Sequence, residues 1–140
     1  MTVRLVQRED KAFWYSLDRH LPEAEFDKKV RDGMGYVLWE EDTPIGILRW
    51  NLFWDQIPFC TLLYIREDLQ KQGCGRALMR FWEAAMRAEG HDMVMVSTQS
   101  DEDAQHFYRK LGYQDAGSLI LNAIPRYAQA AELFLIKDIR

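Results

Sequence analysis

The chain has 140 residues, of which 48% are apolar and 29% are charged, and its net charge is −4. This length suits one domain with its own core, so we expect a single domain over residues 1–140. The acidic balance and the lack of a basic block argue against nucleic acid as a partner, because phosphate neutralisation drives that affinity. No apolar run approaches the roughly 20 residues of a membrane helix, and the start becomes charged too early for a signal peptide. We therefore expect a cytoplasmic protein with no membrane partner.

The first third of the chain predicts a strand followed by two helices. Residues 2–6 alternate like a short strand, and residues 8–21 have apolar side chains at helical spacing. A second helix is expected over residues 22–33, with Pro22 in its first turn and Gly33 as its stop.

Three apolar runs follow, separated by short turns. They cover residues 34–41, 45–54 and 59–65 and predict the strands of an antiparallel meander. After residue 76 apolar side chains recur at helical spacing, and residues 91–99 then form an apolar run typical of a strand covered on both faces. Strand, helix and strand make a βαβ unit with parallel outer strands.

The last third predicts a short helix and a hairpin. The helix is expected over residues 101–113, with Asp101 as its N-cap and Gly112 as its stop. Residues 118–122 and 132–139 are the two strand candidates of the C-terminal hairpin.

The stretch "QKQGCG", residues 70–75, connects the third strand of the meander to the next helix. At such a junction backbone N–H groups converge at the helix N-terminus and favour an anion. Gly73 and Gly75 would let the main chain approach a phosphate, and Lys71 and Arg76 would add charge. The alternative is a loop whose glycines serve only its own backbone angles. The Walker and dinucleotide patterns do not fit these residues.

This stretch resembles the Q/R-x-x-G-x-G/A signature of the GCN5-related N-acetyltransferase (GNAT) superfamily. The run "AQHFYRKLGY", residues 104–113, is similar to the second hallmark of that superfamily. The order of predicted elements agrees over nearly the whole chain. The resemblance implies an α/β fold with a mixed sheet: an N-terminal strand and two helices, an antiparallel meander, a βαβ unit with splayed parallel strands and a C-terminal hairpin.

The resemblance also implies acetyl-CoA as cosubstrate and no metal. The pantetheine arm would pair with the strand around residues 63–65, and the pyrophosphate would bind main-chain N–H groups of the glycine loop. The implied cofactor-binding residues are Leu63, Tyr64, Ile65, Gln70, Lys71, Gln72, Gly73, Cys74, Gly75, Arg76 and Ala77.

Two residues are the catalytic candidates. Tyr108 stands where the superfamily places its tyrosine acid, which protonates the leaving thiolate; the alternative is a core residue on an apolar helical stripe. Oxyanion donors are implied near Ile65. A base is also needed to provide a neutral amine, and Glu67 is the candidate, although this glutamate, Asp55 and the 40–42 turn all suit solvated carboxylates.

Other residues bear on the ligands. Asp101 replaces an asparagine that is frequent in the superfamily, and Gln99 is the alternative amide. The aromatic residues Trp54 and Trp50 share one predicted strand face; Trp54 with Asp55 suggests an acceptor pocket for a cationic amine, whereas core packing is the plainer explanation. Only two cysteines occur, at positions that suit neither a zinc site nor a disulfide framework, so two free thiols are expected.

The leading hypothesis is an N-acetyltransferase that acts on a primary amine of a small molecule or on an amino terminus. A catalytically silent CoA-binding or acyl-CoA-sensing module is the alternative. A third hypothesis is an interaction domain that uses edge strands, as in a homodimer.

Overall fold

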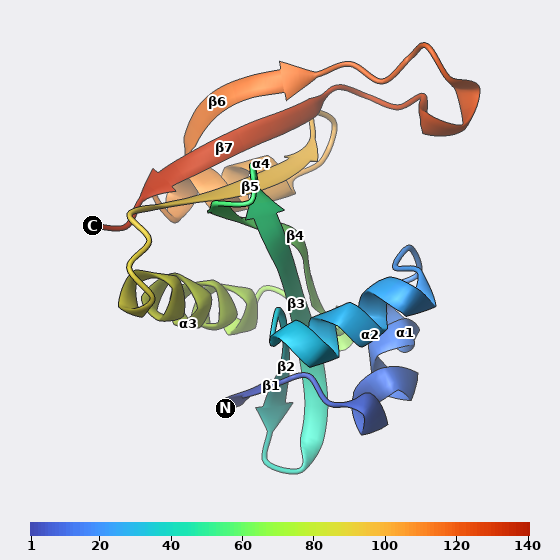
Figure 1. Cartoon of the computed structure of the whole chain (residues 1–140), viewed down its shortest axis with the longest axis vertical. Helices are drawn as coiled ribbons and strands as arrows, with labels where there is room; N and C mark the ends of the chain where they lie inside the picture. Colours follow the sequence, from blue (N-terminus) through green and yellow to red (C-terminus); the bar gives the residue numbers. More distant parts are fainter. The chain divides into compact units, whose positions relative to one another are not determined.

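The computed structural model describes residues 1–140 and contains seven strands, four α-helices and three short 3-10 helices (Figure 1). In chain order they are β1 (Thr2–Leu5), η1 (Arg8–Asp10), α1 (Lys11–Leu17), α2 (Glu23–Asp32), β2 (Gly35–Glu40), β3 (Thr43–Phe53), β4 (Ile57–Ile65), η2 (Glu67–Leu69), α3 (Cys74–Ala88), β5 (Met93–Gln99), α4 (Ala104–Lys110), β6 (Gln114–Leu119), η3 (Pro125–Tyr127) and β7 (Glu132–Asp138). The mixed α/β class and the predicted order of elements are confirmed. None of the helices is both long and apolar enough to cross a membrane.

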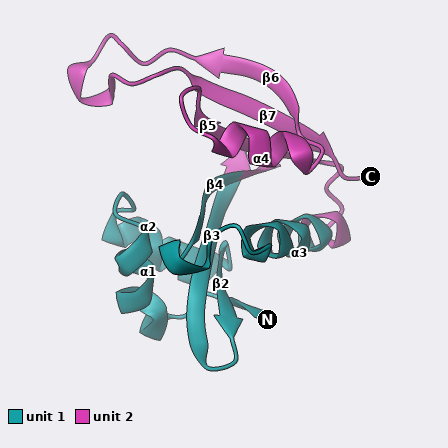
Figure 2. Cartoon of the chain, turned by 180° about the vertical axis from the view of Figure 1, so that it is seen from behind, with its two compact units in different colours: residues 1–51, 60–85 teal, residues 52–59, 86–140 magenta.

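The chain forms two compact units, coloured separately in Figure 2. Unit 1 comprises Met1–Asn51 and Cys60–Ala85, and unit 2 comprises Leu52–Phe59 and Met86–Arg140. The boundary cuts the hairpin of β3 and β4, so the tip of that hairpin belongs to unit 2.

The strands of unit 1 lie in the order β1-β2-β3-β4. β2 pairs antiparallel with β3, as the meander predicted, and also with β1. Residues 35–38 of β2 and 45–48 of β3 are all buried, and because side chains alternate along a strand, both faces of these strands are covered. Val37 and Ile47 face α1 and α2, where they pack with Trp14 and Phe26 in one core cluster.

The other face of this sheet is covered by α3. Its residues Leu78, Met79 and Trp82 are fully buried. The Trp82 ring lies 6.2 Å from the ring of Trp50, centroid to centroid, so Trp50 is a core residue. The predicted helical stripe is therefore correct, and it holds α3 and the loop before it against the sheet.

In unit 2 the strands lie in the order β5-β7-β6, with antiparallel pairing on both sides of β7. The C-terminal hairpin is confirmed, but its first strand lies earlier than the predicted residues 118–122. A bulge between Asp115 and Gly117 breaks the alternation, and all six residues of β6 are exposed, which removed the period-2 signal. The N-cap prediction for Asp101 is wrong, because α4 begins at Ala104 with Asp103 in the cap position.

A buried ion pair connects the end of α1 to the sheet. The Arg49 guanidinium donates to Asp18 at 2.8 Å and to the Thr61 hydroxyl of β4 at 2.8 Å. Trp14 Nε1 also donates to Asp18, at 3.0 Å. Burial acts to raise the pKa of Asp18, but these donors and the Arg49 charge outweigh it and lower that pKa below its ordinary value. Arg49 therefore joins α1, β3 and β4 through one side chain.

We expect Asp18→Asn to lower the free energy of unfolding by about 3 kcal/mol, because Arg49 is left buried without its counter-charge. Urea unfolding at pH 7 measures this loss. The carboxylate stabilises the fold above its unfolded-state pKa, and that contribution is lost as pH falls through the depressed native pKa. The difference between wild type and variant should therefore shrink in acid.

Asp32→Asn is the matched control, because Asp32 also has a lowered pKa but forms an exposed pair with Arg31. We expect this variant to leave the free energy of unfolding close to that of the wild type, because an exposed ion pair contributes little to stability. Equal losses from the two variants would contradict the structural role assigned to Asp18.

Candidate active site

The end of β4 lies unusually close to β3. A Cβ atom added at Gly46 would stand 2.6 Å from Ile65 Cδ1 and 3.2 Å from the Tyr64 carbonyl oxygen. The backbone N–H of Arg66 donates to the Ile45 carbonyl at 2.8 Å. These contacts hold the strand segment that contains Leu63, Tyr64 and Ile65.

The segment after β4 folds back onto this strand end. The Gln70 side-chain amide donates to the Ile65 carbonyl at 2.9 Å, so it closes the short connection that contains η2. The sequence motif predicted that Gln70 binds the cofactor. In the structure its side-chain amide also has a structural role, because it donates to the Ile65 carbonyl.

The glycine loop has two residues in the left-handed backbone region. Lys71 has φ 64° and Gly73 has φ 88°. Apart from Gly73 and its two chain neighbours, no residue has an atom within 4 Å of the place where a Cβ of Gly73 would stand. Glycine is thus favoured here by the backbone angle, and the space beside it is open to a ligand.

The first turn of α3 follows at once. Its first intrahelical bond runs from the Ala77 N–H to the Gly73 carbonyl at 3.0 Å. The N–H groups of Cys74, Gly75 and Arg76 consequently have no acceptor within the helix. Gly75 lies in this turn, whereas the sequence placed it in the loop.

The charges around these donors are positive. Lys71 and Arg76 are exposed and form no ion pair within the chain. Free N–H donors, the positive end of a helix dipole and two cations together make a site for a bound anion such as a diphosphate. Cys74, at the start of the helix, is buried.

Tyr108 lies on α4 in unit 2 and is buried. Its ring contacts those of Phe107 and Tyr113, with centroid distances of 5.3 and 5.7 Å. The apolar stripe predicted for this helix is therefore present, and Tyr108 is part of it.

Glu67, the candidate base, is the first residue of η2 and is exposed. Its side chain forms no hydrogen bond or ion pair, which is the arrangement of an ordinary surface carboxylate. Asp101 is also exposed. The side-chain amide of Gln99, the alternative to Asp101, donates a hydrogen bond to the side-chain oxygen of Gln129 at 3.4 Å.

Trp54 and Asp55 lie outside β3, in the turn between β3 and β4. Both have left-handed backbone angles, with φ of 56° and 59°. The predicted alternation that placed Trp54 on the face of Trp50 is wrong, because the strand ends at Phe53 and the turn redirects the side chains that follow. Trp54 is 74% exposed, whereas Trp50 is buried.

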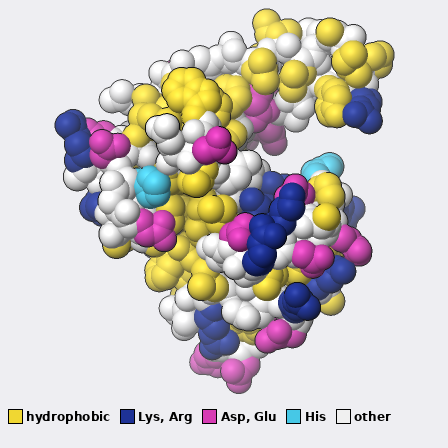
Figure 3. Space-filling view, viewed as in Figure 1, with side chains coloured by type: hydrophobic (Ala, Val, Ile, Leu, Met, Phe, Trp, Pro, Cys, Tyr) yellow, Lys and Arg dark blue, Asp and Glu magenta, His cyan; other side chains and the backbone are white.

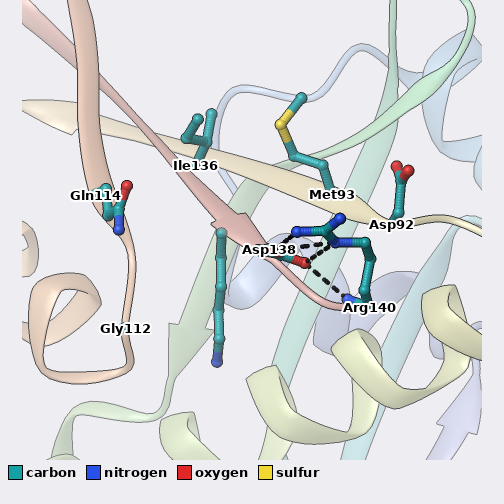
Figure 4. Close-up of a pocket in the computed structure, with 8 residues that line it drawn as sticks. Asp92, Met93, Gly112, Gln114, Ile136, Asp138 and Arg140 are labelled. Atoms are coloured by element: carbon teal, nitrogen blue, oxygen red, sulfur yellow. Dashed lines mark hydrogen bonds and ion pairs between the residues drawn. The ribbon is translucent and has the colours of Figure 1, made fainter.

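A surface hollow of about 410 Å³ lies in unit 2, at the ends of β5, β6 and β7 (Figure 4). Its charged wall contains Asp138 and Arg140, which form an ion pair of 2.7 Å. Hydrogen bonds from Arg140 lower the pKa of Asp138 to about 2. None of the residues predicted for a ligand lies in this hollow.

The long connection between β6 and β7 exposes hydrophobic side chains, which Figure 3 shows along this segment. Three of its large side chains are exposed, Ile120, Ile124 and Tyr127, and so is Leu119 at the end of β6. The Arg126 guanidinium lies over the Tyr127 ring at 4.6 Å.

Sequence reasoning did not identify the buried charges of unit 1. Arg49 pairs with Asp18, and Lys29 Nζ donates to the Trp50 carbonyl at 2.6 Å. Burial, and then the charge of Arg49, lower the pKa of Lys29. A single arginine within the apolar run "IGILRWNLFW" was the available signal, because an isolated charge in a doubly buried strand requires a partner.

Comparison with known proteins shows which family the chain belongs to. A family model described as "Acetyltransferase (GNAT) domain" matches residues 31–115, which is more than half of the chain. The chain belongs to this family of acetyltransferases, and the resemblance found in its motifs is confirmed. No curated protein matches the sequence.

Solved structures share the fold at low identity. Ard1 from Thermoplasma volcanium has a TM-score of 0.86 and 17% identity, covering 99% of this chain and 97% of that chain. The ribosomal-protein-S18-alanine N-acetyltransferase from Escherichia coli has a TM-score of 0.79 and 18% identity, covering 99% and 93%. Arabidopsis thaliana Naa50, in complex with the bisubstrate analogue CoA-Ac-MVNAL, has a TM-score of 0.80 and 14% identity, covering 98% and 97%.

We expect the Cys60 thiol to be unreactive in the native protein, because burial raises its pKa to about 12. In a Cys74→Ser variant, which leaves Cys60 as the single thiol, alkylation by iodoacetamide at pH 8 should be at least about 100-fold slower than in urea. Intact mass measures the rate. Alkylation of the native variant at the rate of the unfolded one would contradict the burial of Cys60.

Proposed function

We propose that the protein is an acetyl-CoA-dependent N-acetyltransferase that transfers the acetyl group to a primary amine of a small molecule or to an amino terminus. The observation that carries this proposal is the glycine loop. Open space at Gly73, unpaired helix donors after it and the free cations Lys71 and Arg76 together suit a diphosphate.

The residues proposed to hold acetyl-CoA are those of the loop and of the adjoining strand end, residues 63–65. When bound, acetyl-CoA would supply the thioester that the amine attacks. The close approach of β3 and β4 at Gly46 supports this role for the strand, because it keeps the backbone of Tyr64 and Ile65 in place.

The proton transfers require two groups of this chain. An alkyl ammonium has a pKa of about 10.4, so the amine must lose a proton before attack. We propose Tyr108 as the acid for the leaving thiolate and retain Glu67 as the proposed base. Support for Tyr108 is its place in the "AQHFYRKLGY" motif; support for Glu67 is only its position after β4.

The silent CoA-binding module is the second candidate. The exposure of Glu67 favours it, because a solvated carboxylate without partners lacks the tuned environment that catalytic bases commonly have. Turnover with any amine separates the two candidates.

We expect Gly73→Val to weaken acetyl-CoA binding at least about tenfold, because the added side chain enters the open space beside the proposed diphosphate and strains the backbone. Titration calorimetry measures the Kd. Gly90→Val is the matched control: Gly90 has φ 98°, and no atom lies within 4 Å of its Cβ position.

Gly90 lies in the turn after α3, away from the loop in sequence, so its valine variant should keep the wild-type Kd. Equal loss of binding in both variants would assign the effect to backbone strain. An unchanged Kd for the Gly73 variant would remove the loop from the cofactor site.

Tyr108→Phe should lower kcat at least about tenfold and leave the Kd for acetyl-CoA unchanged, because only the proton donor is removed. Steady-state rates of CoA release measure kcat. Tyr113→Phe is the control, since it deletes the hydroxyl of another buried tyrosine in ring contact with Tyr108. Wild-type turnover in Tyr108→Phe would rule out the acid role.

A further inference from the structure

At the tip of the β3–β4 hairpin, Trp54 has backbone angles that tryptophan does not favour. Two-residue turns with both φ values positive prefer asparagine, aspartate and glycine, and a bulky residue in this region is an outlier. Trp54 adopts φ 56° there and is 74% exposed, so burial does not compensate for the strain. An exposed aromatic side chain held in a strained turn is typical of a residue retained for binding.

Trp54 begins a strip of four aromatic rings within unit 2. Its ring lies 4.9 Å from that of Phe53, which lies 6.3 Å from Phe59, which in turn lies 5.9 Å from Phe134 on β7, all measured between centroids. Phe53, Phe59 and Phe134 are only partly buried. The strip therefore presents aromatic surface to a ligand.

The surroundings of Phe134 leave room on this face. Directly paired residues of neighbouring strands share a face, and Phe134 pairs with Ser97 of β5 and Gly117 of β6. Gly117 has no side chain, and no atom lies within 4 Å of its Cβ position. Leu135, one residue further along β7, points to the opposite face and is fully buried.

Carboxylates flank the strip. Asp55 follows Trp54 and is exposed without an ion pair. Glu132 lies two residues before Phe134, hence on the same face of β7, and is oriented by a hydrogen bond of 3.0 Å from Gln129. The Lys137 side chain belongs to the opposite face, and Arg140 pairs with Asp138.

We propose that this strip binds the non-reacting ammonium group and the carbon chain of an acceptor with two amino groups, a small linear diamine. This inference rests on the proposed acetyltransferase function. Aromatic faces attract cations, and carboxylates hold them in the charged state. The amine that attacks must be neutral, so an ammonium group held by Asp55 or by Glu132 is not the one that reacts.

The experiment compares 1,4-diaminobutane with butylamine, which has the same chain and one amino group. For the wild type we expect a KM for the diamine about tenfold lower than that for the monoamine. Asp55→Asn and Glu132→Gln each keep side-chain shape and should reduce this preference at least about threefold, because each removes one charge that holds the second ammonium group.

Glu41→Gln is the matched control for charge. Glu41 is an exposed carboxylate with φ 55° at the β2–β3 turn of unit 1, so its loss should leave the preference unchanged. Trp54→Asn should raise the melting temperature by about 2 °C or more, because asparagine tolerates the turn, and should raise the KM for the diamine. A variant that is more stable but binds the diamine less well is the signature of a residue retained for binding.

Equal KM values for the two amines in the wild type would overturn the inference and leave the acetyltransferase function intact. If neither amine is acetylated, calorimetry of 1,4-diaminobutane with the protein and CoA decides. Binding that weakens in Asp55→Asn would support the diamine site while the proposed function fails. No binding, or binding unaffected by Asp55→Asn and Glu132→Gln, would overturn the inference.

Discussion

The largely buried Arg49 side chain, which is 14% exposed, is the constraint on which the architecture of unit 1 depends. A guanidinium in a sheet covered on both faces requires acceptors, and Asp18 and Thr61 supply them. Satisfying this one charge brings the end of α1 onto β3 and joins β3 to β4. The strand end proposed to hold the cofactor arm is thus connected to the helices through a fully paired charge rather than through apolar contacts alone.

The proposed anion site depends on backbone more than on side chains. The left-handed angles at Lys71 and Gly73 turn the chain into α3, whose first N–H groups then lack intrahelical acceptors. Burial of Leu78 and Trp82 holds the helix against the sheet, so those donors are presented by a rigid element. Gln70 contributes by tying the loop to Ile65.

At the tip of the β3–β4 hairpin the residue type does not match the local backbone geometry, in contrast to the glycine positions. Gly46 and Gly73 occupy positions where local geometry favours glycine, whereas Trp54 occupies one where its side chain is disfavoured. A strained backbone persists when the surrounding structure or a function maintains it. The ring contact between Trp54 and Phe53 compensates for only part of the backbone strain, because most of the Trp54 side chain is exposed.

The sequence by itself determined the elements whose patterns are local. The stripe of α3, the stop at Gly33 and the glycine loop were all readable, because period and φ preference depend on neighbouring residues. The limits of β6 could not be predicted, because a bulge and full exposure leave no alternation of apolar and polar residues. Trp54 was assigned to the wrong position because β3 ends one residue before it. Only the tertiary structure decided that Arg49 meets Asp18, 31 residues apart, and that Phe59 meets Phe134. Such contacts depend on strand register and chain crossing, which no local pattern encodes.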